Sequence, residues 1–186
     1  MRYARFVVLP ILALILAPSL CRAATIEYEH DGAPLFSITF PGGWYVDEDY
    51  EAEAKAAGTD EGTDPEIRIL EAMPGDGTKL WFGIWVAPKA TTFERALEYV
   101  ASLDGYLFTD VEASQPRDTE LRGMAAKTFY GTARREGEDV EFAVALFEPR
   151  DEVMVVALYV GRPETWKAHQ EELEAVVDSL KPVVVR

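Results

Sequence analysis

Residues 153–160 read Val-Met-Val-Val-Ala-Leu-Tyr-Val, an unbroken apolar run. A run this short, rich in β-branched side chains and preceded by the turn-forming sequence Glu-Pro-Arg-Asp at 148–151, favours a strand over a helix. Successive side chains of a strand point to opposite faces of the sheet, so this strand needs an apolar layer on each side. The run therefore predicts the central strand of a sheet that is covered on both faces.

The remaining predicted strands are short and are separated by tight turns. A second run with two apolar faces spans 80–86, and the dipeptides Asp31-Gly32, Arg122-Gly123 and Glu136-Gly137 are turn signals between other runs. Connections this short favour antiparallel pairing of successive strands. The strands expected cover residues 26–30, 35–40, 67–69, 80–86, 108–111, 125–133, 140–147 and 153–160.

Helical patterns lie between and after these strands. Thr91 and Glu94 form a capping box, and apolar residues at helical spacing follow as far as Gly105. Pro163 suits the first turn of a closing helix, whose apolar stripe includes Trp166. A shorter helix is expected over 51–57, followed by an exposed loop. The sequence thus predicts one α+β domain over residues 24–186: an α/β/α sandwich with a mostly antiparallel central sheet flanked by helices.

The first 23 residues have the pattern of a secretion signal. Two arginines near the start precede an apolar run over 6–17, which is too short to span a bilayer. Cys21 and Ala23 are small residues at the positions that signal peptidase prefers, so we expect a mature start near Ala24. Cys21 could instead be the acylated cysteine of a lipoprotein, but Leu20 before it argues against that processing. The protein is expected to be exported, either periplasmic or secreted, with no direct membrane insertion after the signal is removed.

The mature domain is strongly acidic. Without the leader it has 15 basic and 33 acidic side chains, a formal net charge of −18. Such a charge repels phosphate backbones and anionic lipids, which argues against nucleic acid or a membrane surface as the partner. It is compatible with cations or with a basic protein surface, and equally with an acidic protein that is simply soluble.

Residues 36–44, Phe-Ser-Ile-Thr-Phe-Pro-Gly-Gly-Trp, resemble the opening of PsbP-like proteins, a group that includes the bacterial DcrB-like proteins and the PsbP subunits of photosystem II. The ending Val-Val-Asp-Ser-Leu at 176–180, after a helix with Trp166, is also similar. The resemblance implies an exported α/β/α sandwich that acts as an accessory or assembly factor. It supplies no catalytic residue, and nothing in this sequence indicates a photosynthetic role.

The acidic stretch 47–66 is one candidate for a binding site. Ca²⁺ prefers several converging oxygen ligands, which Asp60, Glu61 and Asp64 could offer. The stretch lacks EF-hand spacing, however, and a solvated acidic loop explains it as well. No cofactor is expected. A cation-responsive protein that uses this stretch is therefore the alternative to an accessory protein.

Enzyme chemistry finds little support in the sequence. The two histidines, His30 and His169, are far apart, and each fits a surface or structural role. The serines lie in no nucleophile-elbow pattern, so an unrecognised hydrolase is a further alternative only. We expect no enzyme activity.

Trp44, directly after the Pro-Gly-Gly turn, is the candidate for binding a partner. Its indole either packs in the core or forms the rim of a groove. These observations lead to one hypothesis: an exported, non-enzymatic binding or accessory protein whose partner is a protein of the cell envelope.

Overall fold

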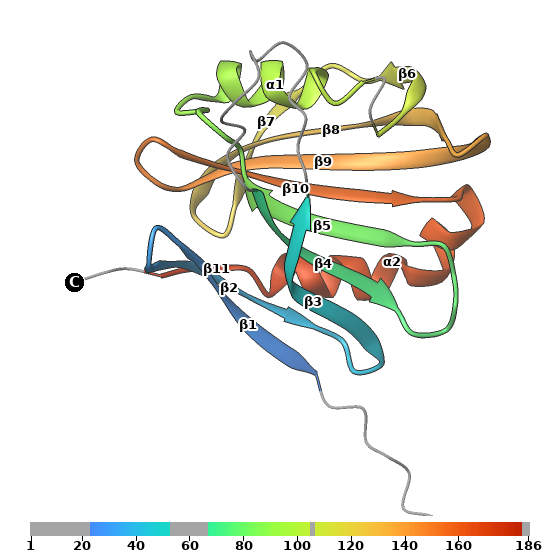
Figure 1. Cartoon of the computed structure of the whole chain (residues 1–186), viewed down its shortest axis with the longest axis horizontal. Helices are drawn as coiled ribbons and strands as arrows, with labels where there is room; N and C mark the ends of the chain where they lie inside the picture. Colours follow the sequence, from blue (N-terminus) through green and yellow to red (C-terminus); the bar gives the residue numbers. More distant parts are fainter. Residues whose placement is uncertain (1–22, 53–66, 105–106, 184–186) are drawn as a thin grey trace, which may run out of the picture.

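The structure, a computed structural model, describes residues 23–52, 67–104 and 107–183, with the backbone alone for 49–52. Its elements follow the order strands, helix, strands, helix (Figure 1). They are β1 (Ala24–His30), β2 (Ala33–Phe40), β3 (Trp44–Ala52), β4 (Ile67–Pro74), β5 (Trp81–Val86), α1 (Phe93–Ala101), β6 (Thr109–Ala113), β7 (Arg117–Leu121), β8 (Met124–Arg135), β9 (Glu138–Arg150), β10 (Val153–Gly161), α2 (Pro163–Asp178) and β11 (Lys181–Pro182).

The strands form two antiparallel sheets. The large sheet has the order β3-β4-β5-β10-β9-β8-β6, and β7 also pairs with β8. The small sheet has the order β1-β2-β11. The α+β class and the mostly antiparallel pairing predicted from the sequence are confirmed.

Strand β10 lies inside the large sheet, as its apolar sequence predicts. It pairs with β5 on one side and β9 on the other, so that Ala157 lies opposite both Ile84 and Ala145. Val155 is fully buried on one face and Val156 is 1% exposed on the other. The strand therefore needs two separate covering layers.

The two covering layers differ, and this corrects the predicted α/β/α arrangement. One face of the large sheet packs against α1, through a cluster that contains Val156 and Leu158. The other face packs against α2 together with the small sheet, through a cluster that contains Val155 and Ala157. In Figure 1, α1 lies at the top and α2 lies near the small sheet. Helices therefore cover only part of the large sheet, because β1 and β2 also supply buried apolar side chains to the second layer, among them Tyr28, Phe36 and Phe40.

Strand β2 holds the small sheet against the large one with aromatic side chains. Phe36 packs edge-on against Phe147 of β9, with ring centroids 5.7 Å apart, and Phe40 packs in the same way against Phe82 of β5 at 5.8 Å. Both phenylalanines are fully buried. At the C-terminal end of α2, the Ser179 hydroxyl oxygen accepts a hydrogen bond of 2.7 Å from the Thr39 amide. The Phe-Ser-Ile-Thr-Phe sequence is thus the seam between the two sheets.

Both predicted long helices are present. Thr92, one residue later than expected, caps α1 by accepting a hydrogen bond from the Arg95 amide, and α2 begins at Pro163 as predicted. The helix expected over 51–57 is wrong at its start, since Glu51 and Ala52 pair with Arg68 and Ile67 as the end of β3. Pairing with β4 here overrides the helical propensity of Glu and Ala. Among the described residues, no helix is long and apolar enough to cross a membrane.

The two-layer arrangement predicts that both faces of β10 contribute to stability. Val155→Ala and Val156→Ala should each lower the free energy of unfolding by about 1–3 kcal/mol, because each removes buried methyl groups and leaves a cavity. Val111→Ala on the exposed strand β6 serves as the control and should cost less than either. Urea denaturation measures all three. A cost for one of the β10 variants no larger than that of the control would contradict burial on that face.

Candidate functional site

Trp44, the residue singled out from the sequence, is half-buried where β3 begins. Its ring stacks on Phe40 with centroids 6.1 Å apart, and its indole N–H donates a hydrogen bond of 3.0 Å to the Glu172 carboxylate of α2. Trp44 thereby ties the turn after β2 to the second helix. It lines none of the pockets described below, and its role in binding a partner stays a prediction.

His169 lies beside Trp44 in a cluster of polar side chains. His169 is 8% exposed, and its ring meets the Trp44 ring edge-on with centroids 6.4 Å apart. Its Nδ1 is 2.8 Å from the Glu172 carboxylate, and its Nε2 is 3.2 Å from both the Asp76 carboxylate and the Thr78 hydroxyl. Each ring nitrogen therefore faces a carboxylate, one from α2 and one from the turn between β4 and β5.

The turn that supplies Asp76 is itself held by hydrogen bonds. The amide and hydroxyl of Thr78 both donate to Asp76 Oδ1, at 2.9 and 2.8 Å. These donors, followed by the nearby His169, hold the pKa of Asp76 below its ordinary value. The cluster can thus fasten the turn to α2. Both ring nitrogens of His169 are engaged in these contacts.

His30 and three of the serines also make contacts with nearby groups of the protein. His30 Nε2 is 3.3 Å from the carboxylate of the neighbouring Asp31, at the turn between β1 and β2. The hydroxyls of Ser102 and Ser179 donate to backbone carbonyls, and that of Ser114 accepts from the Tyr130 amide. The structure places His30 and His169 in separate surroundings.

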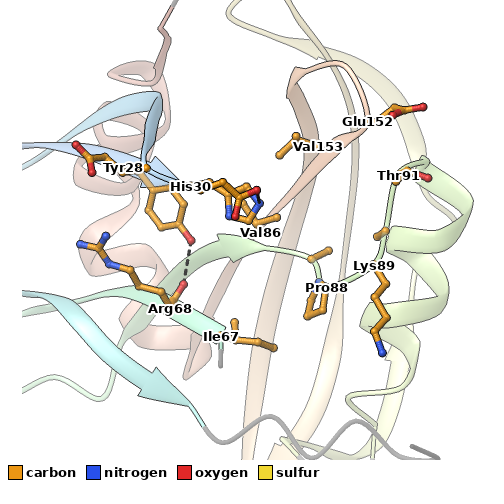
Figure 2. A pocket seen from close by; sticks show the side chains of 15 residues that line it. Tyr28, His30, Ile67, Arg68, Val86, Pro88, Lys89, Thr91, Glu152 and Val153 are labelled. Atoms are coloured by element: carbon orange, nitrogen blue, oxygen red, sulfur yellow. Dashed lines mark hydrogen bonds and ion pairs between the residues drawn. The ribbon is translucent and has the colours of Figure 1, made fainter. Parts of the chain in front are cut away.

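A large open pocket lies at one end of the molecule, with a volume of about 770 Å³ (Figure 2). Four segments far apart in the chain form it: the end of β1 with its turn, the start of β4, the loop from β5 to α1, and the turn between β9 and β10. We call it the turn pocket. Its lining residues are Tyr28, Glu29, His30, Asp31, Gly32, Ile67, Arg68, Val86, Ala87, Pro88, Lys89, Ala90, Thr91, Glu152 and Val153.

The turn pocket combines an apolar interior with charged residues. Tyr28, Ile67 and Ala87 are buried, whereas Asp31, Lys89 and Glu152 are exposed. In Figure 2, Lys89 and Glu152 lie across the pocket from Tyr28 and Arg68. The Tyr28 hydroxyl donates a hydrogen bond of 2.9 Å to the Arg68 carbonyl, and burial raises the pKa of that hydroxyl. A hydrogen bond therefore joins β1 to β4 on this side of the pocket, whereas the opposite side consists of loop residues.

Three of the exposed lining residues have left-handed backbone conformations. Asp31, Lys89 and Glu152 have φ angles of 54°, 57° and 62°. Tight turns require such angles, which non-glycine residues adopt at some cost. These turns present charged side chains around the pocket on a rigid scaffold, the usual arrangement of binding loops. Sequence reasoning identified the Asp31-Gly32 and 148–151 turns but had no means of placing them together.

The candidate calcium ligands Asp60, Glu61 and Asp64 lie outside the described residues, as does Cys21. Within the part of the chain that is described, no group of three or more His, Cys, Asp or Glu side chains is arranged to hold a metal ion. The cation hypothesis therefore stays a prediction.

No family model and no curated protein matches this sequence. Solved structures do share its fold. Cyanobacterial PsbP (CyanoP) from Synechocystis sp. PCC 6803 superposes with a TM-score of 0.59 at 9% identity, covering 89% of this chain and 95% of the other. This chain has a PsbP-like fold. The prediction from residues 36–44 is thus confirmed at the level of the fold.

Two other structures with this PsbP-like arrangement are bacterial. LpqN, described as involved in cell envelope biogenesis of Mycobacterium tuberculosis, gives a TM-score of 0.55 at 10% identity over 88% of this chain and 91% of LpqN. PA94 from Pseudomonas aeruginosa, a protein of unknown function, gives 0.52 at 15% identity over 87% and 99%. At these identities the similarity establishes the fold alone.

The contact between Trp44 and Glu172 yields a quantitative prediction. A double-mutant cycle of Trp44→Phe and Glu172→Met should show coupling of about 1 kcal/mol in unfolding free energy, because the indole N–H donates to the carboxylate and methionine supplies no comparable acceptor. Trp81→Phe is the matched control, since Trp81 is another half-buried indole that packs on the α1 side of the large sheet. If the effects of Trp44→Phe and Glu172→Met are additive, as those of Trp81→Phe and Glu172→Met should be, this hydrogen bond does not stabilise the fold.

Proposed function

We propose that this protein is an exported, non-enzymatic binding or accessory protein that recognises a protein of the cell envelope through the turn pocket. The observation that carries the proposal is the make-up of that pocket. Buried apolar side chains lie inside it and charged loop residues surround it. Protein interfaces have this organisation, with a desolvated apolar centre and a polar rim that stays in contact with water.

The charge of the domain supports a protein partner with a basic or mixed surface. The mature chain is acidic overall, so a partner with exposed lysines or arginines is attracted over distances comparable to the Debye length. The turn pocket itself contains both signs, with Glu29, Asp31 and Glu152 opposed by Arg68 and Lys89. Complementary charges on a partner would orient it in the pocket and exclude wrong partners.

Export and an envelope location rest on the sequence and on one structural neighbour. The leader over residues 1–23 has the charge, apolar run and cleavage pattern of a secretion signal. LpqN, which has a similar fold, is described as a protein of cell envelope biogenesis. We extend that context to this chain as part of the proposal.

A non-enzymatic role is supported by how the reactive side chains are used. His169 is engaged at both nitrogens, and His30 lies against Asp31. His30 lines the turn pocket, whereas Ser102 and Ser179, whose hydroxyls donate to backbone carbonyls, lie outside it. Binding therefore accounts for this surface better than acyl transfer does.

The proposal predicts that blocking the turn pocket prevents capture of the partner. Val153 is half-buried in the pocket, so Val153→Arg should place a charged side chain there and abolish capture of an envelope protein by the tagged mature domain. Ala168→Arg adds the same side chain at an exposed position of α2, outside the pocket, and should leave capture unchanged. Quantitative mass spectrometry of crosslinked envelope fractions measures both.

Two controls make this experiment decisive. Circular dichroism and thermal unfolding must show that Val153→Arg is folded, so that loss of capture reports on the surface. If a folded Val153→Arg protein captures the same partner as the wild type, the turn pocket is not the binding surface. If the wild type captures no protein above the level of a tag-only control, the accessory-protein proposal is wrong.

A further inference from the structure

A second hollow surface lies beside α2, along the face of that helix that carries Trp166, Leu173 and Val177. We call it the α2 groove. It consists of two adjoining hollows of about 530 and 500 Å³ that share Tyr130, Ala143, Tyr159 and Trp166. Each hollow falls within the range of small-molecule sites in proteins. Neither the candidate residues from the sequence nor the turn pocket are part of it.

The floor of the groove follows from strand register. Thr128, Ala145 and Ala157 lie side by side on β8, β9 and β10, and Tyr130, Ala143 and Tyr159 form the next row. Three alanines in these rows leave space under α2 that larger side chains would fill. Leu121, Leu173 and Val177 line the same hollow, so its interior is apolar.

The second hollow is aromatic and acidic. Tyr130 is 58% exposed, an unusually open position for a large side chain, and the half-buried Trp166 packs edge-on against Tyr159 with ring centroids 4.6 Å apart. Glu112 and Glu141 complete the lining. Aromatic faces and carboxylates together attract organic cations, through the ring quadrupole and through direct charge.

A buried hydroxyl group at the junction of the two hollows lacks a partner. Tyr159 is 4% exposed, and its hydroxyl has no hydrogen-bond partner among the described residues. It lies against Gly161, where a Cβ would be 2.6 Å from the oxygen. Burial, and then the Glu141 carboxylate, raise the pKa of this hydroxyl, so it stays neutral at physiological pH. A buried hydroxyl without a partner destabilises the protein, and a ligand with a polar head group would supply that partner.

The charges around the groove select the sign of the ligand. Four carboxylates line its two hollows, from Glu112, Glu141, Glu174 and Asp178, and the lining contains neither lysine nor arginine. Among the described residues, Asp178 is the only one of these four carboxylates that forms an ion pair. Its partner is Arg122, at 3.7 Å. An anionic head group would therefore be repelled, whereas an ammonium would be attracted.

We infer that the α2 groove binds a small amphiphilic amine: an alkyl or aryl chain in the apolar hollow and a protonated primary or secondary amine beside Tyr130, Glu141 and Tyr159. The amine N–H groups would donate to the glutamate carboxylates and to the Tyr159 hydroxyl oxygen. This site is separate from the turn pocket and does not depend on the proposed protein partner.

Titration calorimetry with probes of equal chain length tests this inference. Decylammonium, decyl sulfate and decyl maltoside are each added below their micellar concentrations to the mature protein. Decylammonium should bind, and decyl sulfate should bind more weakly by about tenfold or more. The Glu112→Gln, Glu141→Gln double variant should lose most of this preference for the cation. Glu98→Gln, Glu164→Gln is the matched control, since both residues lie outside the groove, and it should retain the preference.

The role of the buried hydroxyl is tested by one further pair of measurements. Tyr159→Phe should weaken decylammonium binding several-fold but leave decyltrimethylammonium, which has no N–H, unaffected. Unfolding of Tyr159→Phe in urea should show no loss of stability, because the removed hydroxyl has no partner.

Several outcomes would overturn the inference. Equal affinity for the cationic and anionic probes would reduce it to non-specific adsorption, and no binding of decylammonium would end it. Equal loss of charge preference in the matched control would show that the overall acidity of the domain, and not this groove, selects cations. Binding of a basic amphipathic peptide but of none of the three probes would make the groove a protein docking surface instead.

Discussion

Strand β10 carries apolar side chains on both faces, and the rest of the structure is organised to keep both out of water. Val155 and Val156 are neighbours in sequence, yet they belong to separate hydrophobic clusters. One cluster is closed by the short helix α1. The other is closed by α2 and the small sheet, whose strand β2 inserts Phe36 and Phe40 against β9 and β5. Because burial of apolar area is the dominant stabilising term, neither layer is dispensable.

The unequal layers also explain where the surface is hollow. The β1–β2 turn of the small sheet lies beside the loop after β5 and the turn between β9 and β10, and these segments leave a gap between them. That gap is the turn pocket. Beside α2, three alanines of β9 and β10 leave the α2 groove open next to Trp166. The Trp44–Glu172–His169 contacts fix α2 to the β2–β3 turn and so hold the helix that forms one wall of the α2 groove.

The sequence predicts the parts of this fold that local patterns determine. The central strand at 153–160, the start of α2 at Pro163 and the Asp31-Gly32 hairpin follow from apolar runs, proline geometry and turn chemistry. Strand β7, Arg-Asp-Thr-Glu-Leu, is missed because it is polar and largely exposed and pairs only with β8. β11 is missed because it consists of Lys181 and Pro182, which pair only because α2 delivers them to β2.

Of the candidate sites, the sequence proposes Trp44 but not its partner Glu172, and it finds the turns but not the pocket. Such juxtapositions depend on topology, which a single sequence does not specify.

The central claim is that an envelope protein binds at the turn pocket, and in vivo photocrosslinking tests it most directly. A photoreactive benzoylphenylalanine is placed at the exposed position 89 in the pocket and, for comparison, at the exposed position 168 on α2, and each full chain is irradiated in its source cells. We expect one protein to be crosslinked at position 89 and not at position 168. Equal crosslinking at both positions, or none at position 89 in a protein that is exported and folded, would contradict the account.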